Sequence, residues 1–178
     1  MRYLRPVVGM TVLAAVFGVW AMRLAPSFDT ARGAATQQAA LPGDADPAAL
    51  ERSALSAFTD FARLEARFDL AFLAYYHDKA AIHLHRLLPD GGAETLDYGR
   101  AGWAGLQKHW YADGAGRIAE DAGPAYSQLH TRVEGNLVII EGRRRVEAEN
   151  HTGSYKVVMV QTAGGGWKII EEWIESQL

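Results

Sequence analysis

Apolar residues recur at steps of three or four over the first part of the folded chain. The series begins after Asp46-Pro47, an acidic residue suited to a helix N-cap followed by a proline suited to the first turn. The spacing predicts one long helix, or two helices with a kink, ending at His77-Asp78. The apolar stripe consists of Leu50, Ala54, Phe58, Phe61, Leu64, Phe68, Phe72 and Tyr75.

Alternation of apolar and polar positions follows and predicts a strand at 81–88, a turn at 89–92 and a second strand at 94–98. A short helix is expected to open at Gly99-Arg100. Four more strands are predicted between glycine or asparagine turns. Helices first and long antiparallel strands last are typical of an α+β fold with a curved sheet wrapped over the helices. The last four strands are expected at 126–134, 137–149, 154–162 and 167–175.

The amino end is almost entirely apolar over residues 7–22, with Arg2 and Arg5 before the run and Arg23 after it. The run is longer than a signal-peptide core of about 7–15 residues and slightly shorter than the roughly 20 of a membrane span. We expect a separate apolar helix over 1–25: an uncleaved signal anchor, a cleaved signal peptide or a buried helix.

The basic residues before this run favour a cytoplasmic amino terminus. They predict an inner-membrane anchor with a periplasmic domain, or secretion after cleavage. Residues 26–46 are rich in Ala, Gly, Gln, Thr and Pro and are expected to form a flexible linker. Residues 47–178 are expected to form the folded domain.

Composition narrows the function classes. Hydrophobic residues make up 49% of the 178 residues, enough for a sizeable core, and the net charge of -3 with no basic face argues against nucleic-acid binding. The chain has no cysteine, which excludes disulfides, thiolate zinc sites and cysteine nucleophiles. Phosphate-loop, dinucleotide and nucleophile-elbow motifs are also absent from the sequence, so no cofactor is expected.

Strand parity identifies two charged candidates. Arg144 interrupts an apolar row with Val138 and Ile140, which suggests a group that binds an anion or a carbonyl, or else a wetted residue near the rim. Glu171 is expected on the same face as Ile169 and Trp173, where its pKa would be raised and it would act as a general base. The alternative for Glu171 is a salt bridge to a neighbouring strand. Glu172 is expected on the face of this strand opposite Glu171. Parity leaves open which of the two faces points into the fold.

Histidines and aromatic residues supply the other candidates. His83 and His85 point to the same side of a strand, as metal ligands do, and His130 would be a third. No carboxylate stands at a matching spacing, so we expect no metal ion. These histidines are expected either to line a pocket or to be exposed to solvent. His83 is also a candidate catalytic residue. The expected pocket lining, for which ordinary core packing is the alternative, is His85, Trp103, Trp110, Tyr126, His130, Tyr155 and Trp173.

Four segments in order resemble motifs of the nuclear transport factor 2-like superfamily, also described as SnoaL-like or cystatin-like. Residues 69–82 resemble its helix ending in Tyr-x-Asp-Asp-Ala, and Gly99-Arg100 its next helix start. Residues 138–143 resemble its Ala-x-Val-x-Gly strand, and residues 166–170 resemble its closing Gly-Trp-Arg-Ile strand. The resemblance implies a cone-shaped fold with a strongly curved antiparallel or mixed sheet. Lys79 replaces an acidic residue of the family pattern, and Glu171-Glu172 stand where many members carry histidines.

This resemblance implies three alternative functions. The first is a membrane-tethered periplasmic domain that binds a small hydrophobic molecule or a protein partner. The second is a SnoaL-like acid–base enzyme, an isomerase, cyclase or hydrolase, that uses Glu171 or a histidine with Arg144. The third is a scaffold subunit of an envelope secretion complex. Members often dimerise through the outer sheet face, so exposed apolar residues on strand 155–161 would favour a homodimer.

Overall fold

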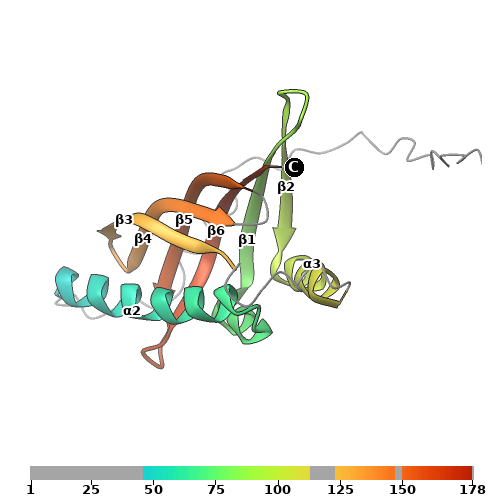
Figure 1. The fold of residues 1–178 in the computed structure, drawn as a ribbon. Helices are drawn as coiled ribbons and strands as arrows, with labels where there is room; N and C mark the ends of the chain where they lie inside the picture. Colours follow the sequence, from blue (N-terminus) through green and yellow to red (C-terminus); the bar gives the residue numbers. More distant parts are fainter. Residues whose placement is uncertain (1–45, 113–122, 147–149, 178) are drawn as a thin grey trace, which may run out of the picture. The chain divides into compact units, whose positions relative to one another are not determined.

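The computed structural model of the protein describes residues 46–112, 123–146 and 150–177. The predicted apolar helix and the linker lie outside these ranges. Within them, no helix is long and apolar enough to cross a membrane. The described elements are α2 (Pro47–Ala66), the 3-10 helix η1 (Leu70–Tyr75), β1 (Tyr76–Leu87), β2 (Ala93–Gly99), α3 (Arg100–Ala112), β3 (Ala125–Glu134), β4 (Leu137–Val146), β5 (His151–Gln161) and β6 (Trp167–Gln177) (Figure 1).

The apolar stripe forms two helices rather than one. Asp46 caps α2 by accepting a hydrogen bond from the backbone N–H of Ala48 at 3.0 Å. After α2 the backbone of Phe68 has a left-handed φ of 55°. Asp69 then caps η1 with its side chain. The predicted alternative of two helices with a break is therefore confirmed.

The first strand begins earlier than predicted. β1 starts at Tyr76, which pairs in parallel with Ile169 of β6. The expected helix end at His77-Asp78 is therefore wrong, because strand pairing overrides the helical spacing at this point. The shift makes Tyr76 a sheet residue, and it is 1% exposed.

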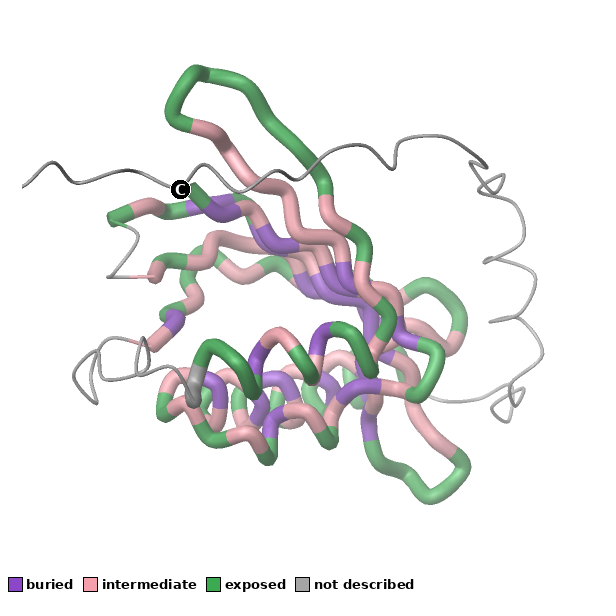
Figure 2. The backbone as a smooth tube through the Cα atoms, turned by 90° about the vertical axis from the view of Figure 1, so that its right-hand side faces the viewer, coloured by how far each residue is buried: buried purple, intermediate pink, exposed green. Residues whose placement is uncertain are grey.

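All six predicted strands are present in one mixed sheet of order β2-β1-β6-β5-β4-β3. β1 and β6 run parallel, and the other neighbours run antiparallel. α2 covers one face of the sheet, here called the inner face, and α3 lies beside β1 and β2 (Figure 1). Buried residues gather where α2 meets the sheet (Figure 2). The predicted α+β fold is confirmed, and the core of the inner face includes Val138, Ile140, Tyr155, Val157, Met159, Ile169 and Ile174.

A β-bulge in β6 determines which of its side chains face α2. The pairing of β6 with β5 skips Ile170, so this residue is the extra one in the ladder. The alternation shifts by one position there, and Ile169 and Glu172 both become buried. Glu171 and Trp173 point to the other face, which we call the outer face. The expected grouping of these two residues with Ile169 is wrong for this reason.

A second register shift bends β3 over β4. Gln128 has a left-handed φ of 52° at this shift, and Tyr126 before it and Leu129 after it both pack on the core. The bend brings β3 close to Gly142, where an added Cβ would lie 2.7 Å from the Ser127 carbonyl oxygen. Glycine permits this approach because it has no Cβ.

Candidate ligand site on the inner sheet face

Glu172 of β6 lies on the inner face with 0% of its surface exposed. The Tyr76 hydroxyl donates a hydrogen bond to its Oε2 at 2.5 Å, and the Tyr155 hydroxyl donates to its Oε1 at 2.7 Å. Trp103 of α3 donates from its indole N–H to the Tyr76 hydroxyl oxygen at 3.2 Å. We call these four residues the Glu172 cluster. It joins α3, β1, β5 and β6 through buried polar groups.

A second buried glutamate, Glu65, projects from α2 toward the sheet and is 3% exposed. It accepts a hydrogen bond from the Tyr126 hydroxyl of β3. Arg144 of β4 donates to its Oε1 at 3.3 Å, and the Arg144 side chain is 11% exposed. We call Glu65, Tyr126 and Arg144 the Glu65 cluster. Because a buried charge needs a partner, this ion pair fixes the end of α2 against β3 and β4.

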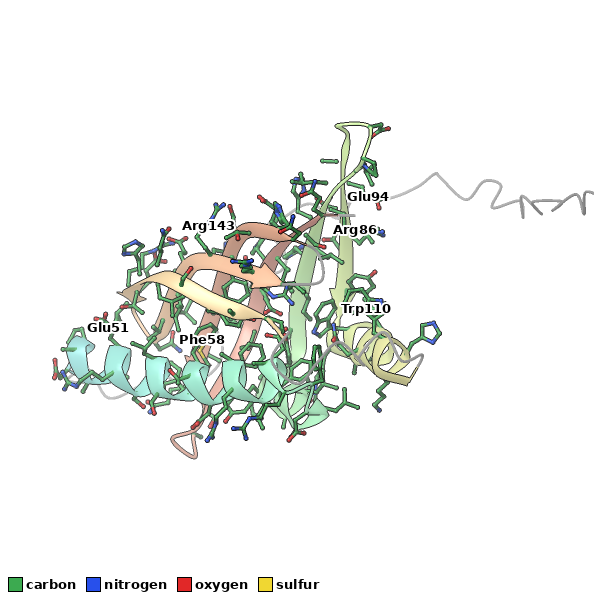
Figure 3. All side chains as sticks on the ribbon, viewed as in Figure 1. Glu51, Phe58, Arg86, Glu94, Trp110 and Arg143 are labelled. Atoms are coloured by element: carbon green, nitrogen blue, oxygen red, sulfur yellow. The ribbon has the colours of Figure 1, made fainter. Side chains whose placement is uncertain are left out.

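Aromatic rings connect the two clusters. The ring centroids of Tyr126 and Tyr155 are 4.7 Å apart in an edge-to-face arrangement. Phe58 of α2 packs on both rings at 5.2 and 5.9 Å, and it lies between α2 and the sheet (Figure 3). These apolar surroundings strengthen the electrostatic coupling between the two carboxyl groups.

The pKa of Glu172 is raised from its ordinary value of 4.5 to about 7. Burial is the largest cause, and the charge of Glu65 adds to it. Hydrogen bonds from Tyr76 and Tyr155 and the charge of Arg144 act in the opposite direction but do not outweigh burial. Glu172 therefore exchanges a proton near neutral pH.

The pKa values of the three tyrosines are raised well above 10. Burial is the largest cause for each of them, followed by the nearest glutamate: Glu172 for Tyr76 and Tyr155, and Glu65 for Tyr126. The phenols therefore stay protonated at neutral pH and remain hydrogen-bond donors. The arrangement is chemically capable of moving a proton at Glu172 while the phenols hold its carboxyl group in place.

Four residues predicted for the site come together here. Trp103, Tyr126 and Tyr155 belong to the two clusters, and Arg144 projects into the same interior. The ion pair with Glu65 offsets the cost of burying the Arg144 guanidinium. Its neighbour Arg143 lies on the outer face and donates to the Thr152 carbonyl oxygen at 2.7 Å (Figure 3).

Three other predicted residues lie together on the outer face. His83 stacks on Trp173 with ring centroids 4.0 Å apart, and its Nδ1 is 2.6 Å from Asp97 Oδ1. Trp173 donates from its indole N–H to Glu171 Oε1 at 2.5 Å. Lys156 pairs with Glu171 at 3.1 Å. These residues form a surface network that does not contact Glu172.

The pKa of Glu171 does not follow the expectation for a buried base. Partial burial acts to raise this pKa, but hydrogen bonds from Trp173 and Lys156 outweigh it, and the pKa of Glu171 is lowered. Glu171 is thus ionised at neutral pH and paired with a cation. The predicted alternative of a salt bridge applies, with a lysine as the partner instead of an arginine.

The remaining predicted pocket residues lie away from both clusters. Trp110 of α3 is 52% exposed and is the one large hydrophobic residue exposed in the described ranges. His130 is also exposed, and His85 lies beside Thr95 with 3.1 Å between Nδ1 and the hydroxyl oxygen. On β5, Val158 is 7% exposed, so the apolar exposure that would favour a homodimer is not found there.

Sequence reasoning missed Glu172, Tyr76 and Glu65 as site residues. A signal existed for Glu65, which lies four positions after Phe61 and seven after Phe58 and therefore falls on the apolar stripe of α2. Tyr76 was missed because the helical spacing before it predicted that the helix would continue through this position. No pattern in the sequence marks the bulge that turns Glu172 inward.

Among the residues that the structure describes, no group of three or more His, Asp or Glu residues gathers as metal ligands do. The inner site is a carboxyl group held by two phenols, one of which accepts a hydrogen bond from the Trp103 indole. Its chemistry is that of hydrogen bonding and proton exchange.

No protein-family model and no curated protein matches the chain. Solved structures share its fold. A nuclear transport factor 2-like protein of unknown function from Pseudomonas putida is 16% identical with a TM-score of 0.50, over 71% of this chain and 85% of that one. A cystatin-like fold protein from Burkholderia xenovorans is 10% identical with a TM-score of 0.51, over 72% and 92%.

A protein of unknown function from Pectobacterium atrosepticum is 15% identical with a TM-score of 0.51, over 78% of this chain and 98% of that one. At these identities the likeness establishes the fold and carries no activity. The chain thus has the nuclear transport factor 2-like, cystatin-like fold that its motifs predicted.

Proposed function

We propose that the chain is a ligand-binding domain of the nuclear transport factor 2-like type, and that its inner sheet face receives a small, largely apolar molecule with a polar head. The observation that carries this proposal is the Glu172 cluster. A fully buried carboxyl group in the middle of a strand is costly to stability, and Glu172 stands among residues that would otherwise form an apolar core.

The surroundings favour an apolar ligand body. Phe58 and Phe72 pack in the core with the rings of Tyr76 and Tyr155, and Trp103 of α3 reaches the Tyr76 hydroxyl. Aromatic walls with a few polar groups at one point are typical of small-molecule sites. The polar head would meet Glu172, since that carboxyl group has lone pairs beyond the two that the tyrosines use.

The test is a thermal-shift screen of the full chain against small hydrophobic molecules, such as steroid-like, polyketide-like and fatty probes. A ligand is expected to raise the melting temperature of the wild type and of Glu171→Gln, and to have a reduced effect on Glu172→Gln. Glu171 and Glu172 are adjacent and face opposite sides of the sheet, so this pair of variants separates the inner face from the outer one. The absence of a shift with every probe would refute the proposal.

A second candidate function is acid–base catalysis on such a ligand. The specific observation is the pKa of Glu172, which at about 7 is suited to taking up and returning a proton. The tyrosine hydroxyls at 2.5 and 2.7 Å would orient the carboxyl group. Glu172 therefore takes the role that the sequence suggested for Glu171. Once a ligand with an acidic C–H is found, its deuterium exchange in the presence of wild type, Glu172→Gln and Glu171→Gln decides between binding and catalysis.

The place of the domain in the cell is part of the same proposal. The basic and apolar residues at the amino end support a domain tethered outside the cytoplasmic membrane. Fractionation of cells that express the full chain tests this, because a tethered domain is found in the membrane fraction and is digested by protease added to the periplasm. Protection from that protease would count against a periplasmic location.

A further inference from the structure

Glu172 and its tyrosine partner on β1 are closed off from solvent. Glu172 is 0% exposed and Tyr76 is 1% exposed. The Trp103 indole of α3 donates to the Tyr76 hydroxyl oxygen at 3.2 Å, and Trp103 itself is 4% exposed. A molecule from solvent therefore reaches this carboxyl group only after an element of the fold has moved. The two long helices, α2 and α3, differ in how firmly they are held.

The helix α2 is part of the centre of the core. It buries Leu50, Ala54, Phe58 and Phe61 against the rest of the fold. Withdrawal of α2 would expose all of these apolar side chains, so its opening is expected to require unfolding of the whole domain.

The helix α3 is held by a smaller buried surface. It lies beside β1 and β2 (Figure 1). Trp103 is the one buried hydrophobic residue among the α3 side chains that the structure describes, and Leu106 is partly buried against the core. Arg100 at the start of α3 pairs with Asp78, but the Asp78 side chain is 85% exposed, and ion pairs in water contribute little to stability. Few buried apolar contacts are typical of an element that opens locally.

Two glycines inside α3 weaken it further. Gly102 and Gly105 do not have a left-handed φ. A Cβ added at Gly105 would meet nothing within 4 Å, and at Gly102 it would make an ordinary contact of 3.6 Å with the Tyr98 side chain. Neither backbone conformation nor packing therefore requires glycine at these positions. Each glycine lowers the equilibrium constant for helix formation roughly fivefold relative to alanine.

Resting on the proposed function, we propose that α3 is the gate of the inner face, and that its local displacement withdraws Trp103 and admits a small molecule between α3 and β1. In the closed state the Trp103 indole occupies the Tyr76 hydroxyl oxygen. In the open state that oxygen accepts a hydrogen bond from the incoming molecule. Gly102 and Gly105 set the population of the open state, because they weaken the helix without altering its contacts.

The first experiment is native-state hydrogen exchange of the full chain. Amides of α3 are expected to exchange at least about tenfold faster than those of α2, with little dependence on low concentrations of urea, since a local opening exposes little surface. Gly105→Ala is expected to slow exchange in α3 roughly fivefold and to leave α2 unchanged. Gly164→Ala is the matched control, because Gly164 also has open space around it but lies in a turn outside α3, and it is expected to change neither helix.

The second experiment tests whether this opening uncovers the sheet. The chain has no cysteine, so a single introduced thiol reports on its own position. Ile82 of β1 is 0% exposed and pairs with Tyr98, whose ring centroid is 5.9 Å from that of Trp103. The thiol of Ile82→Cys is expected to react through the opening of α3, and roughly fivefold more slowly when Gly105→Ala is added. Ala54 of α2 is also 0% exposed, and the thiol of Ala54→Cys is expected to react only through global unfolding.

Two results would overturn the gate. The first is exchange of α3 amides at the same rate as those of α2, or exchange in α3 that Gly105→Ala leaves unchanged. The second is fast exchange in α3 with equal reaction rates of the Ile82→Cys and Ala54→Cys thiols, since α3 would then open without uncovering the sheet. Neither result decides the proposed function, which the thermal-shift screen tests at equilibrium. Exchange of the wild-type chain gives the first answer without any variant.

Discussion

Replacement of Glu172 by glutamine is expected to stabilise the protein at alkaline pH. The reason is that the pKa of Glu172 is raised from 4.5 to about 7 in the folded protein. The folded state then holds a proton that the unfolded state has lost. The stability from this proton is fully present below about pH 4.5, declines as the pH rises toward 7, and is absent above that value.

The size of the effect follows from the shift. A change of one pKa unit corresponds to about 1.4 kcal/mol, so a rise from 4.5 to about 7 corresponds to about 3 kcal/mol between acid and alkaline conditions. Glutamine resembles the protonated acid in shape and in having both a donor and an acceptor for Tyr76 and Tyr155. The variant should therefore match the wild type near pH 4.5 and exceed its stability by about 3 kcal/mol above pH 8.

The assay is urea unfolding of the full chain, followed by tryptophan fluorescence from pH 4 to pH 9. Other carboxyl groups titrate in the same range, so the informative quantity is the difference between variant and wild type. Glu171→Gln is the matched control. Its folded pKa is lowered, so its stability contribution is present above the unfolded pKa and is lost as the pH falls, the opposite sign to Glu172. A difference for Glu172→Gln that stays flat with pH would refute the reasoning.

Three further substitutions test the packing around the site by urea unfolding at neutral pH. Arg144→Met leaves the buried Glu65 carboxylate without its guanidinium and is expected to lower the free energy of unfolding by about 3 kcal/mol. An unchanged free energy of unfolding would mean that the pair is not buried in solution. Gly142→Ala should lower the free energy of unfolding by about 1–3 kcal/mol because the new Cβ would meet the Ser127 carbonyl oxygen. Gly164 has open space around it, so Gly164→Ala should change the free energy of unfolding by less than about 0.5 kcal/mol. Equal effects of the two alanines would contradict the close approach of β3 to β4.

Patterns of local spacing predicted the elements of this fold well. Asp46-Pro47 marks the start of α2, the stripe through Phe58 and Phe61 marks its buried face, and the glycine turns separate the strands. Each of these signals depends on neighbours within a few positions. Because residues close together in the chain determine these features, they can be predicted from the sequence alone.

The site was predicted only in part because it depends on contacts between distant elements. Arg144 was found by strand parity, which holds over an uninterrupted strand, and Tyr126 and Tyr155 were named as aromatic residues that could line a pocket. Parity fails at Ile170, where the bulge in β6 turns Glu172 inward and leaves Glu171 outside. The bulge arises from the register between β5 and β6, and nothing in the local sequence of β6 encodes it. One extra residue thus exchanged the roles expected for two adjacent glutamates.

The most direct measurement for this account is a carbon-13 NMR titration of glutamate side-chain carboxyl groups in the full chain. The central claim is that the inner face holds a buried carboxyl group, Glu172, that exchanges its proton near neutrality. One resonance is expected to titrate near pH 7, to be missing in Glu172→Gln and to remain in Glu171→Gln. If every glutamate titrates below about pH 5.5, or if the resonance near pH 7 survives in Glu172→Gln, the claim is contradicted.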